Sequence, residues 1–259
     1  MRRSRIASML AALLLALANA VSADELTASS PGSGGTTRAD TNYKIGDRYT
    51  YRTLDLFSRV EDARHTLRVT DVTDNQVIFN GGRRVTDRLG NDIAAGKGNQ
   101  FSGQQIFVPD YGIGRKWTTR YLMTKPDGSE YVVTYDFEIV AKEPITVPAG
   151  TFLAYRIEGG GYMHQTRGPR KKACEERNAT YKIWIASDEV RRYIAQDYIQ
   201  RGAPIGCRYQ VTTRTELVAF RQGDRSAGVE GPDTLGSEDY VPGHANVEES
   251  PHSEDNAGG

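Results

Sequence analysis

Apolar and polar residues alternate with a period of two along much of the chain between residues 48 and 220. The clearest run is YVVTYDFEIVA at residues 131–141, where three apolar side chains alternate with three polar ones: Tyr135, Phe137 and Ile139 against Thr134, Asp136 and Glu138. In an extended strand, alternate side chains point to opposite faces. This run therefore predicts an amphipathic strand whose polar residues, the carboxylates of Asp136 and Glu138 included, face solvent.

The same alternation predicts several further strands. In the run RYTYRTLDLF at residues 48–57, it divides the side chains between two faces: Tyr49, Tyr51, Thr53 and Phe57 on one, Leu54 and Leu56 on the other. Three more runs rich in aromatic and β-branched residues are expected to be strands, at residues 152–158, 180–186 and 209–220.

Turn-forming residues between these runs predict hairpins. Residues 71–75 (DVTDN) separate extended runs at 66–70 and 76–80, and Gly90-Asn91-Asp92 follows a run at 84–89. Residues 124–128 (TKPDG) separate the runs at 117–123 and 131–141. In that turn, proline presets φ and glycine tolerates the left-handed region. Many short strands joined by turns predict a mainly β fold, a curved antiparallel sheet in one domain.

Residues 187–202 allow two interpretations. Ser187 is a good N-cap, Asp188 and Glu189 would lie in the first helical turn, and Gly202 would end the helix. On local chemistry a short helix is slightly favoured over a strand. We also expect the two acids to pair locally with Arg191 and Arg192.

Composition divides the chain into four zones. Residues 1–23 have three arginines before a short apolar run and end in Ala-Asn-Ala and Val-Ser-Ala, which predicts a secretory signal peptide cleaved at one of two sites. Residues 24–42 are rich in Gly, Ser and Thr and predict a flexible leader. Residues 43–220 form the predicted β domain, with a net charge of +6. Residues 221–259 carry a net charge of −7 and predict a disordered acidic tail.

Export sets the compartment, which we expect to be the bacterial periplasm or the medium. No run after the signal peptide is long enough to predict a transmembrane helix. In an oxidising compartment, the two cysteines, Cys174 and Cys207, predict a structural disulfide. Nucleic acid is an improbable partner there.

Candidate chemistry is sparse. No nucleophile–base pair or Gly-x-Ser-x-Gly motif is visible, and the four histidines, His65, His164, His244 and His252, are too scattered to predict a metal site. We expect no cofactor, no metal and no enzymatic activity. The densest basic patch could contact an anion, for example a lipid head group or an acidic polymer: Arg167, Arg170, Lys171 and Lys172.

A set of motifs resembles a known family. Gly114-Arg-Lys-Trp117 is followed by VPAGTF at residues 147–152, then by Trp184-Ile-Ala-Ser and a final TELVAF run at 215–220. This order resembles a family of exported bacterial β-rich proteins of uncharacterised function. That family is similar to the half-barrel of periplasmic lipoprotein carriers. The resemblance implies a half-barrel with a ligand cleft, favours a strand at residues 187–202 and supplies no catalytic residues. Relatives often have a proline where this chain has Ser187.

Together these observations predict an exported, non-enzymatic binding or carrier domain. Its ligand would be a lipid or another hydrophobic or amphipathic molecule of the cell envelope, held in an apolar cleft on the concave side of the sheet. The alternative is a structural or interaction module that meets an envelope protein or anionic polymer through the basic patch or a sheet edge. The sequence does not distinguish between ligands, partners or oligomeric states.

Overall fold

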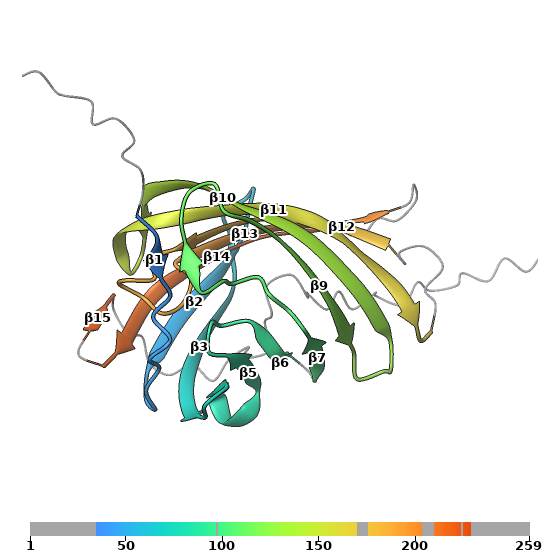
Figure 1. The fold of residues 1–259 in the computed structure, drawn as a ribbon, viewed down its shortest axis with the longest axis horizontal. Helices are drawn as coiled ribbons and strands as arrows, with labels where there is room; N and C mark the ends of the chain where they lie inside the picture. Colours follow the sequence, from blue (N-terminus) through green and yellow to red (C-terminus); the bar gives the residue numbers. More distant parts are fainter. Residues whose placement is uncertain (1–34, 97, 170–175, 204–209, 224, 229–259) are drawn as a thin grey trace, which may run out of the picture. The chain divides into compact units, whose positions relative to one another are not determined.

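The computed structural model describes residues 35–96, 98–169, 176–203, 210–223 and 225–228, all within one compact unit of the chain, residues 34–259 (Figure 1). The described part is mainly β, with one short 3-10 helix at Asn80–Gly82. Its strands are β1 (Thr37–Arg38), β2 (Arg48–Asp55), β3 (Glu61–Val72), β4 (Gln76–Phe79), β5 (Arg84–Asp87), β6 (Asp92–Ala95), β7 (Asn99–Ser102), β8 (Asp110–Tyr111), β9 (Lys116–Thr124), β10 (Glu130–Val147), β11 (Gly150–Arg167), β12 (Glu176–Ile185), β13 (Ala195–Ala203), β14 (Gln210–Gln222) and β15 (Arg225–Ala227).

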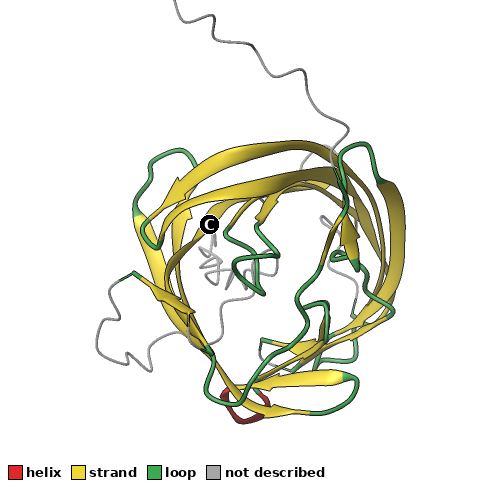
Figure 2. Ribbon diagram, turned by 60° about the vertical axis from the view of Figure 1, so that its left-hand side comes forward, coloured by secondary structure: helices red, strands yellow, loops and turns green. Residues whose placement is uncertain are grey.

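The main sheet closes on itself as an antiparallel barrel (Figure 2). Its strands follow the order β13-β12-β11-β10-β9-β7-β6-β5-β4-β3-β2-β14, and β14 pairs again with β13, so twelve strands form the ring. β15 extends the sheet beside β14, and β1 forms a separate two-stranded sheet with β8.

The predicted half-barrel, an open curved sheet, is therefore corrected to a closed ring. β14 makes the difference because it pairs on one edge with β2, Phe220 opposite Tyr49, and on the other with β13, Glu216 opposite Ala195. Side-chain alternation shows which face of a strand is buried, but it does not show which distant strand forms hydrogen bonds with the backbone at its edge.

The predicted hairpins at residues 66–80, 84–93 and 117–141 are confirmed as β3–β4, β5–β6 and β9–β10. The VPAG segment is the two-residue turn between β10 and β11, with Val147 opposite Gly150. Gly150 has φ of 137°, a conformation that disfavours residues with a side chain. The turn therefore explains why glycine stands at this position of the motif.

Aromatic side chains fill much of the barrel interior. One cluster joins β9, β10, β12 and β13 through neighbouring rings, with centroids 4.7–6.3 Å apart: Tyr121, Tyr135, Phe137, Tyr181 and Tyr198. In β2, Tyr49, Tyr51 and Thr53 face the interior as predicted. Phe57 was predicted on the same face but is 68% exposed, because a register irregularity at Thr53 and Leu54 ends the alternation before the turn.

Two glycines in β11, Gly159 and Gly161, lie against the aromatic cluster. Gly159 pairs with Phe137 and Gly161 pairs with Tyr135. A Cβ at Gly159 would lie 2.2 Å from the Phe137 ring, and one at Gly161 would lie 2.0 Å from the carbonyl oxygen of Thr134. The aromatic rings of β10 thus occupy the space that side chains of β11 would need.

Residues 187–202 form neither a helix nor one strand. Ala186 to Val190 make a single turn, in which the Ala186 carbonyl accepts from the Val190 amide at 2.8 Å, and β13 begins only at Ala195. One turn forms, but the Ser187 hydroxyl has no hydrogen-bonding partner among the described residues, so the predicted N-cap interaction is not made. Pairing of β13 with both β12 and β14 outweighs the helical preference of the later residues.

Regular structure extends past the predicted β domain, residues 43–220, at both ends. β1 lies within the range assigned to the leader, and β15 lies within the range assigned to the acidic tail. Among the described residues, no helix has the length and apolar character needed to cross a membrane.

Candidate functional site

A groove of about 1010 Å³ lies over β9 to β13. Along β10 its lining includes Asp136, Glu138 and Val140, which alternate with the buried interior residues Tyr135, Phe137 and Ile139. Most of the lining therefore lies on the face of the sheet that points away from the barrel interior. Trp117, Phe137 and Tyr181 belong to the opposite, interior face and reach the groove as well. Residues from five strands and from the turn after β2 line it: Leu56, Lys116, Trp117, Thr118, Asp136, Phe137, Glu138, Val140, Glu158, Gly159, Thr180, Tyr181, Lys182, Asp197 and Ile199.

Ion pairs hold two of the groove carboxylates. Lys116 Nζ lies 3.3 Å from a Glu138 oxygen, and Lys182 Nζ lies 3.7 Å from a Glu158 oxygen. Arg156 also contacts Glu158. These side chains are partly or largely exposed, so the pairs fix charge positions more than they stabilise the fold.

The other two carboxylates differ in their surroundings. Asp197 pairs with Arg214 at 2.8 Å, yet partial burial raises its pKa. Asp136 is exposed and accepts a hydrogen bond from the Thr118 hydroxyl at 2.5 Å, with no cationic partner among the residues that the structure describes. Three of the four lining carboxylates thus contact a lysine or an arginine, and Asp136 is the one that contacts none within the described residues.

Apolar side chains complete the lining. Leu56, Val140 and Ile199 are half-buried and come from three separate parts of the sheet. Trp117 stacks on Phe137 with centroids 5.4 Å apart and donates its indole N–H to the Gln105 carbonyl. The groove thus combines apolar surface with fixed charges, the combination that suits an amphipathic ligand.

Where the structure describes the interior side of the sheet, small cavities stand in place of the expected apolar cleft. The cavities found there measure about 10 and 30 Å³, and polar groups take part in lining both. Arg84 and Asp92, on the neighbouring strands β5 and β6, form a buried ion pair with two hydrogen bonds, at 2.7 and 2.8 Å. The aromatic side chains and this polar pair occupy the space in which we expected a ligand.

His65 is part of this polar interior. Its ring is 1% exposed and stacks on Tyr51 at 5.6 Å, and Tyr51 stacks on Tyr193 at 4.8 Å. Burial and the nearby guanidinium groups of Arg84 and Arg192 lower the pKa of His65 to about 3. The imidazole is therefore neutral in the folded protein at any pH above that value.

This lowered pKa predicts a loss of stability in mild acid. In the unfolded chain His65 takes up a proton near its ordinary pKa of 6.5, whereas in the folded chain it does not until about pH 3. The contribution of His65 to the free energy of unfolding is therefore fully present above pH 6.5 and decreases as the pH falls below that value. Between pH 7 and pH 5, we expect the free energy of unfolding to decrease by about 2 kcal/mol from His65 alone.

Urea unfolding of the wild type and His65→Phe at the two pH values measures the effect, because phenylalanine keeps a ring beside Tyr51 and cannot titrate. The exposed His164 provides the control, and His164→Gln should keep the wild-type dependence on pH. An unchanged pH dependence in His65→Phe would contradict the assignment.

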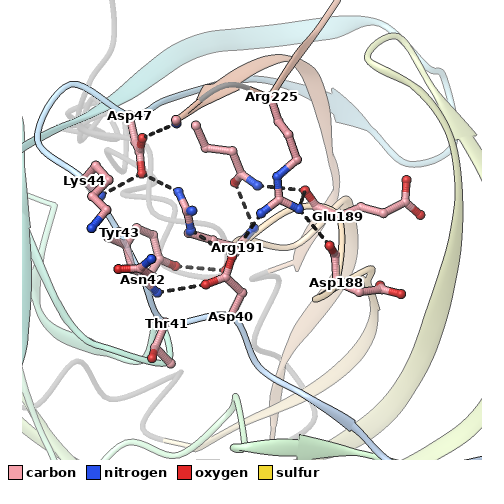
Figure 3. Close-up of polar contacts among 12 residues, drawn as sticks. Asp40, Thr41, Asn42, Tyr43, Lys44, Asp47, Asp188, Glu189, Arg191 and Arg225 are labelled. Carbon is pink, nitrogen blue, oxygen red and sulfur yellow. Dashed lines mark hydrogen bonds and ion pairs between the residues drawn. The ribbon is translucent and has the colours of Figure 1, made fainter.

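A second polar network joins the chain's N-terminal part to the loop before β13 (Figure 3). Arg191 bridges Asp40 at 3.0 Å and Asp47 at 2.8 Å, and its side chain is only 7% exposed. Arg225 reaches Asp40 as well, at 3.2 Å. These contacts are structural, since they tie segments far apart in the sequence to each other.

The expected local pairing of Asp188 and Glu189 with Arg191 and Arg192 is therefore wrong. The carbonyl oxygens of the two acids accept hydrogen bonds from Arg225. Arg191 turns to Asp40 and Asp47, and Arg192 is buried. Neighbours in sequence at a turn need not share a face, whereas the barrel brings distant carboxylates into reach.

Several predicted site residues fall outside the described part of the chain. The disulfide between Cys174 and Cys207 is among these, as are three members of the basic patch: Arg170, Lys171 and Lys172. Arg167 is described, is largely exposed, and lies 3.5 Å from Glu130. His164 lies 3.4 Å from Glu176 on the surface. Within the described ranges, no three His, Cys, Asp or Glu side chains gather as a metal site would require.

The sequence analysis did not predict the groove, although it singled out two of the residues that line it. Asp136 and Glu138 were correctly placed on the solvent face, but their neighbours on β11 to β13 come from distant sequence. The run Gly159-Gly160-Gly161 was the available signal, because consecutive glycines in a strand mark a site of close approach or a bend.

Comparisons with known proteins give structural neighbours only. No family model matches the chain, and no curated protein matches it. One similar structure is that of a Bacteroides fragilis protein predicted to be exported, with a YmcC-like fold (11% identity, TM-score 0.45, covering 72% of this chain and 100% of that one). Another belongs to a Parabacteroides distasonis protein predicted to be a lipoprotein (11%, TM-score 0.37, 71% and 100%). The third is the hypothetical lipoprotein YmcC of Escherichia coli (10%, TM-score 0.35, 69% and 88%). No family model covers the motif at residues 147–152, so that resemblance stays a prediction.

Proposed function

We propose that this chain is a non-enzymatic binding protein of the cell envelope that holds an amphipathic ligand in the groove over β9 to β13. The observation that carries the proposal is the groove itself, about 1010 Å³ and lined by both apolar and charged side chains. Ligand sites in proteins commonly measure about 300–1,000 Å³, so the groove has room for a drug-sized or single-chain lipid molecule. The site differs from the interior cleft that the sequence suggested.

The charges of the groove favour one kind of amphiphile. Glu138 and Glu158 are already paired with lysines, whereas Asp136 has only the Thr118 hydroxyl. A cationic head group could pair with Asp136 while its apolar chain covers Val140 and Ile199. An anionic head group would meet this unpaired carboxylate, because the cations beside the groove are engaged by its other carboxylates. We therefore expect cationic amphiphiles to bind more tightly than anionic ones of equal chain length.

Tryptophan fluorescence can measure this binding directly. Trp117 lines the groove, while the other tryptophan, Trp184, is 8% exposed and does not line it. We expect dodecyltrimethylammonium, titrated below its micelle concentration, to change the emission saturably, and dodecanoate to bind several-fold more weakly. In Trp117→Phe the emission change should disappear.

Two further variants separate the groove from general surface binding. Ile199→Asp places a charge in the apolar lining and should weaken binding at least 10-fold, about 1.4 kcal/mol. Leu153→Asp adds the same charge at an exposed leucine outside the groove and should leave the affinity unchanged. Asp136→Asn should reduce the preference for the cation. Absence of saturable binding by both amphiphiles, or equal weakening by Ile199→Asp and Leu153→Asp, would refute the proposal.

A further inference from the structure

Three arginines stand side by side on the outer face of β14, β2 and β3. Arg48 of β2 lies opposite Arg221 of β14 on one side and opposite Arg68 of β3 on the other. Directly opposite residues of antiparallel strands share a face, with Cβ atoms about 4.5–5.5 Å apart, and like charges in this arrangement repel each other. Arg68 and Arg221 are exposed, and neither forms an ion pair with a described residue. We call these three residues the arginine row.

The same three strands balance their other arginines with carboxylates. Further along, Arg52 lies between Glu216 and Arg64, and it pairs with Glu216 at 2.8 Å, while Arg64 pairs with Glu61 at 2.9 Å. The positions between the two sets carry no charge: Ala219, Thr50 and Thr66. The exposed members of the arginine row, by contrast, have no carboxylate of their own in the described part of the chain.

The last described residue, Gly228, lies close to this row. β15 pairs with β14, with Ser226 opposite Arg221. Gly228 packs tightly on β14, because a Cβ there would lie 2.2 Å from the Val218 carbonyl oxygen and 3.0 Å from the Ala219 Cβ atom. The chain therefore leaves the barrel about two residues from Arg221, or roughly 7 Å along the strand.

The residues that follow, 229–259, form a segment of one charge sign. They include eight Asp and Glu residues and no Lys or Arg. Fully extended, a segment of this length reaches about 100 Å, whereas the arginine row spans two strand spacings, about 10 Å. Tethering gives such a segment an effective concentration in the millimolar range, and several of its carboxylates can engage the row at once, which a chloride ion cannot do.

We propose that residues 229–259 dock on the arginine row and supply the carboxylates that Arg68 and Arg221 lack. Opposite charge, the exit of the chain at Gly228 and the reach of the segment support this occupant. Docking reduces the repulsion between the three guanidinium groups, and salt weakens it because the contact lies at the surface. The inference does not depend on the groove, which lies over other strands of the barrel.

Arginine labelling with phenylglyoxal tests the contact in the full-length chain, with the rate at each arginine followed by peptide mass spectrometry. The compared variant carries amides in place of the eight acids: Glu230, Asp233, Glu238, Asp239, Glu248, Glu249, Glu254 and Asp255. At low ionic strength, Arg68 and Arg221 should react about three-fold faster in this variant than in the wild type. Arg120 of β9, also exposed and without an ion pair to a described residue, should keep its rate. The difference should disappear in about 1 M salt, where the Debye length is about 3 Å.

Unchanged rates at Arg68 and Arg221, or the same acceleration at Arg120, would overturn the proposal. The first result would place the segment elsewhere, and the second would show only a general effect of its negative charge. Labelling at low and high protein concentration identifies the source of the carboxylates. Protection that appears only at high concentration would assign them to a second copy of the chain and would overturn docking within one chain.

A reciprocal measurement follows the segment itself. A glutamate-specific protease should cleave after Glu230 and Glu238 about three-fold faster in the double variant Arg68→Gln, Arg221→Gln than in the wild type. Arg120→Gln removes an exposed arginine outside the row and should leave the cleavage rate unchanged. Equal cleavage rates in the double variant and the wild type would contradict docking on the row.

Discussion

Asp92→Asn is expected to destabilise the protein by about 3–5 kcal/mol, because it leaves the Arg84 guanidinium buried without its counter-ion. The two side chains are only about one-tenth exposed, and both Asp92 oxygens accept hydrogen bonds from Arg84. Asparagine keeps the shape of the side chain but removes its charge and one acceptor. Urea unfolding at neutral pH, followed by circular dichroism, measures the loss.

Glu61 and Arg64 provide a matched control on the surface. They form the same two-bond arrangement, at 2.9 and 3.1 Å, with side chains 37% and 41% exposed. Glu61→Gln should therefore cost less than about 1 kcal/mol. Similar losses in the two variants would show that burial does not determine the strength of the Asp92 pair.

Gly161→Ala should destabilise the protein by about 3 kcal/mol or more. The new methyl carbon would lie 2.0 Å from the Thr134 carbonyl oxygen and 2.9 Å from the Tyr135 Cα atom. Both are backbone atoms of the neighbouring strand, so no change of rotamer can relieve the overlap, and β10 and β11 would have to separate. Thermal unfolding and loss of near-ultraviolet circular dichroism from the tyrosines would report it.

Gly112→Ala tests whether the effect belongs to the contact or to the loss of glycine itself. The nearest atom to a Cβ there is the Thr36 hydroxyl oxygen at 3.5 Å, an ordinary contact. We expect a change within about 0.5 kcal/mol. If both alanine variants unfold alike, the close packing of β10 on β11 does not set the requirement for glycine.

Local patterns in the sequence predicted local structure well. Pro126-Asp127-Gly128 correctly marked the turn between β9 and β10, and the alternation around Tyr135 identified the buried face of β10. The helix predicted at Ser187 was wrong, because a single turn forms there and the Ser187 hydroxyl caps none of the described backbone N–H groups. Pairing of β13 with strands on both sides, which no local signal records, decided its conformation.

The candidate site was harder to predict than the fold. The solvent face of Asp136 and Glu138 followed from alternation, yet a groove depends on how five strands present their outward side chains together. The buried position of Arg192 inside the barrel was likewise not predictable from the local sequence. An arginine beside Asp188 and Glu189 looks like a surface residue in sequence, and only the closed ring places it over the Phe79 ring.

The pairing of β14 with β2 has a consequence for biogenesis. Tyr49 pairs with Phe220, which lies 171 positions later in the sequence. One edge of β2 therefore stays unpaired until β14 has been synthesised. Contacts of such sequence separation slow folding, and the nascent chain presents an open edge meanwhile. The ring cannot close until β14 has been synthesised, so the incomplete sheet keeps a free edge for most of the time that the chain takes to emerge from the ribosome.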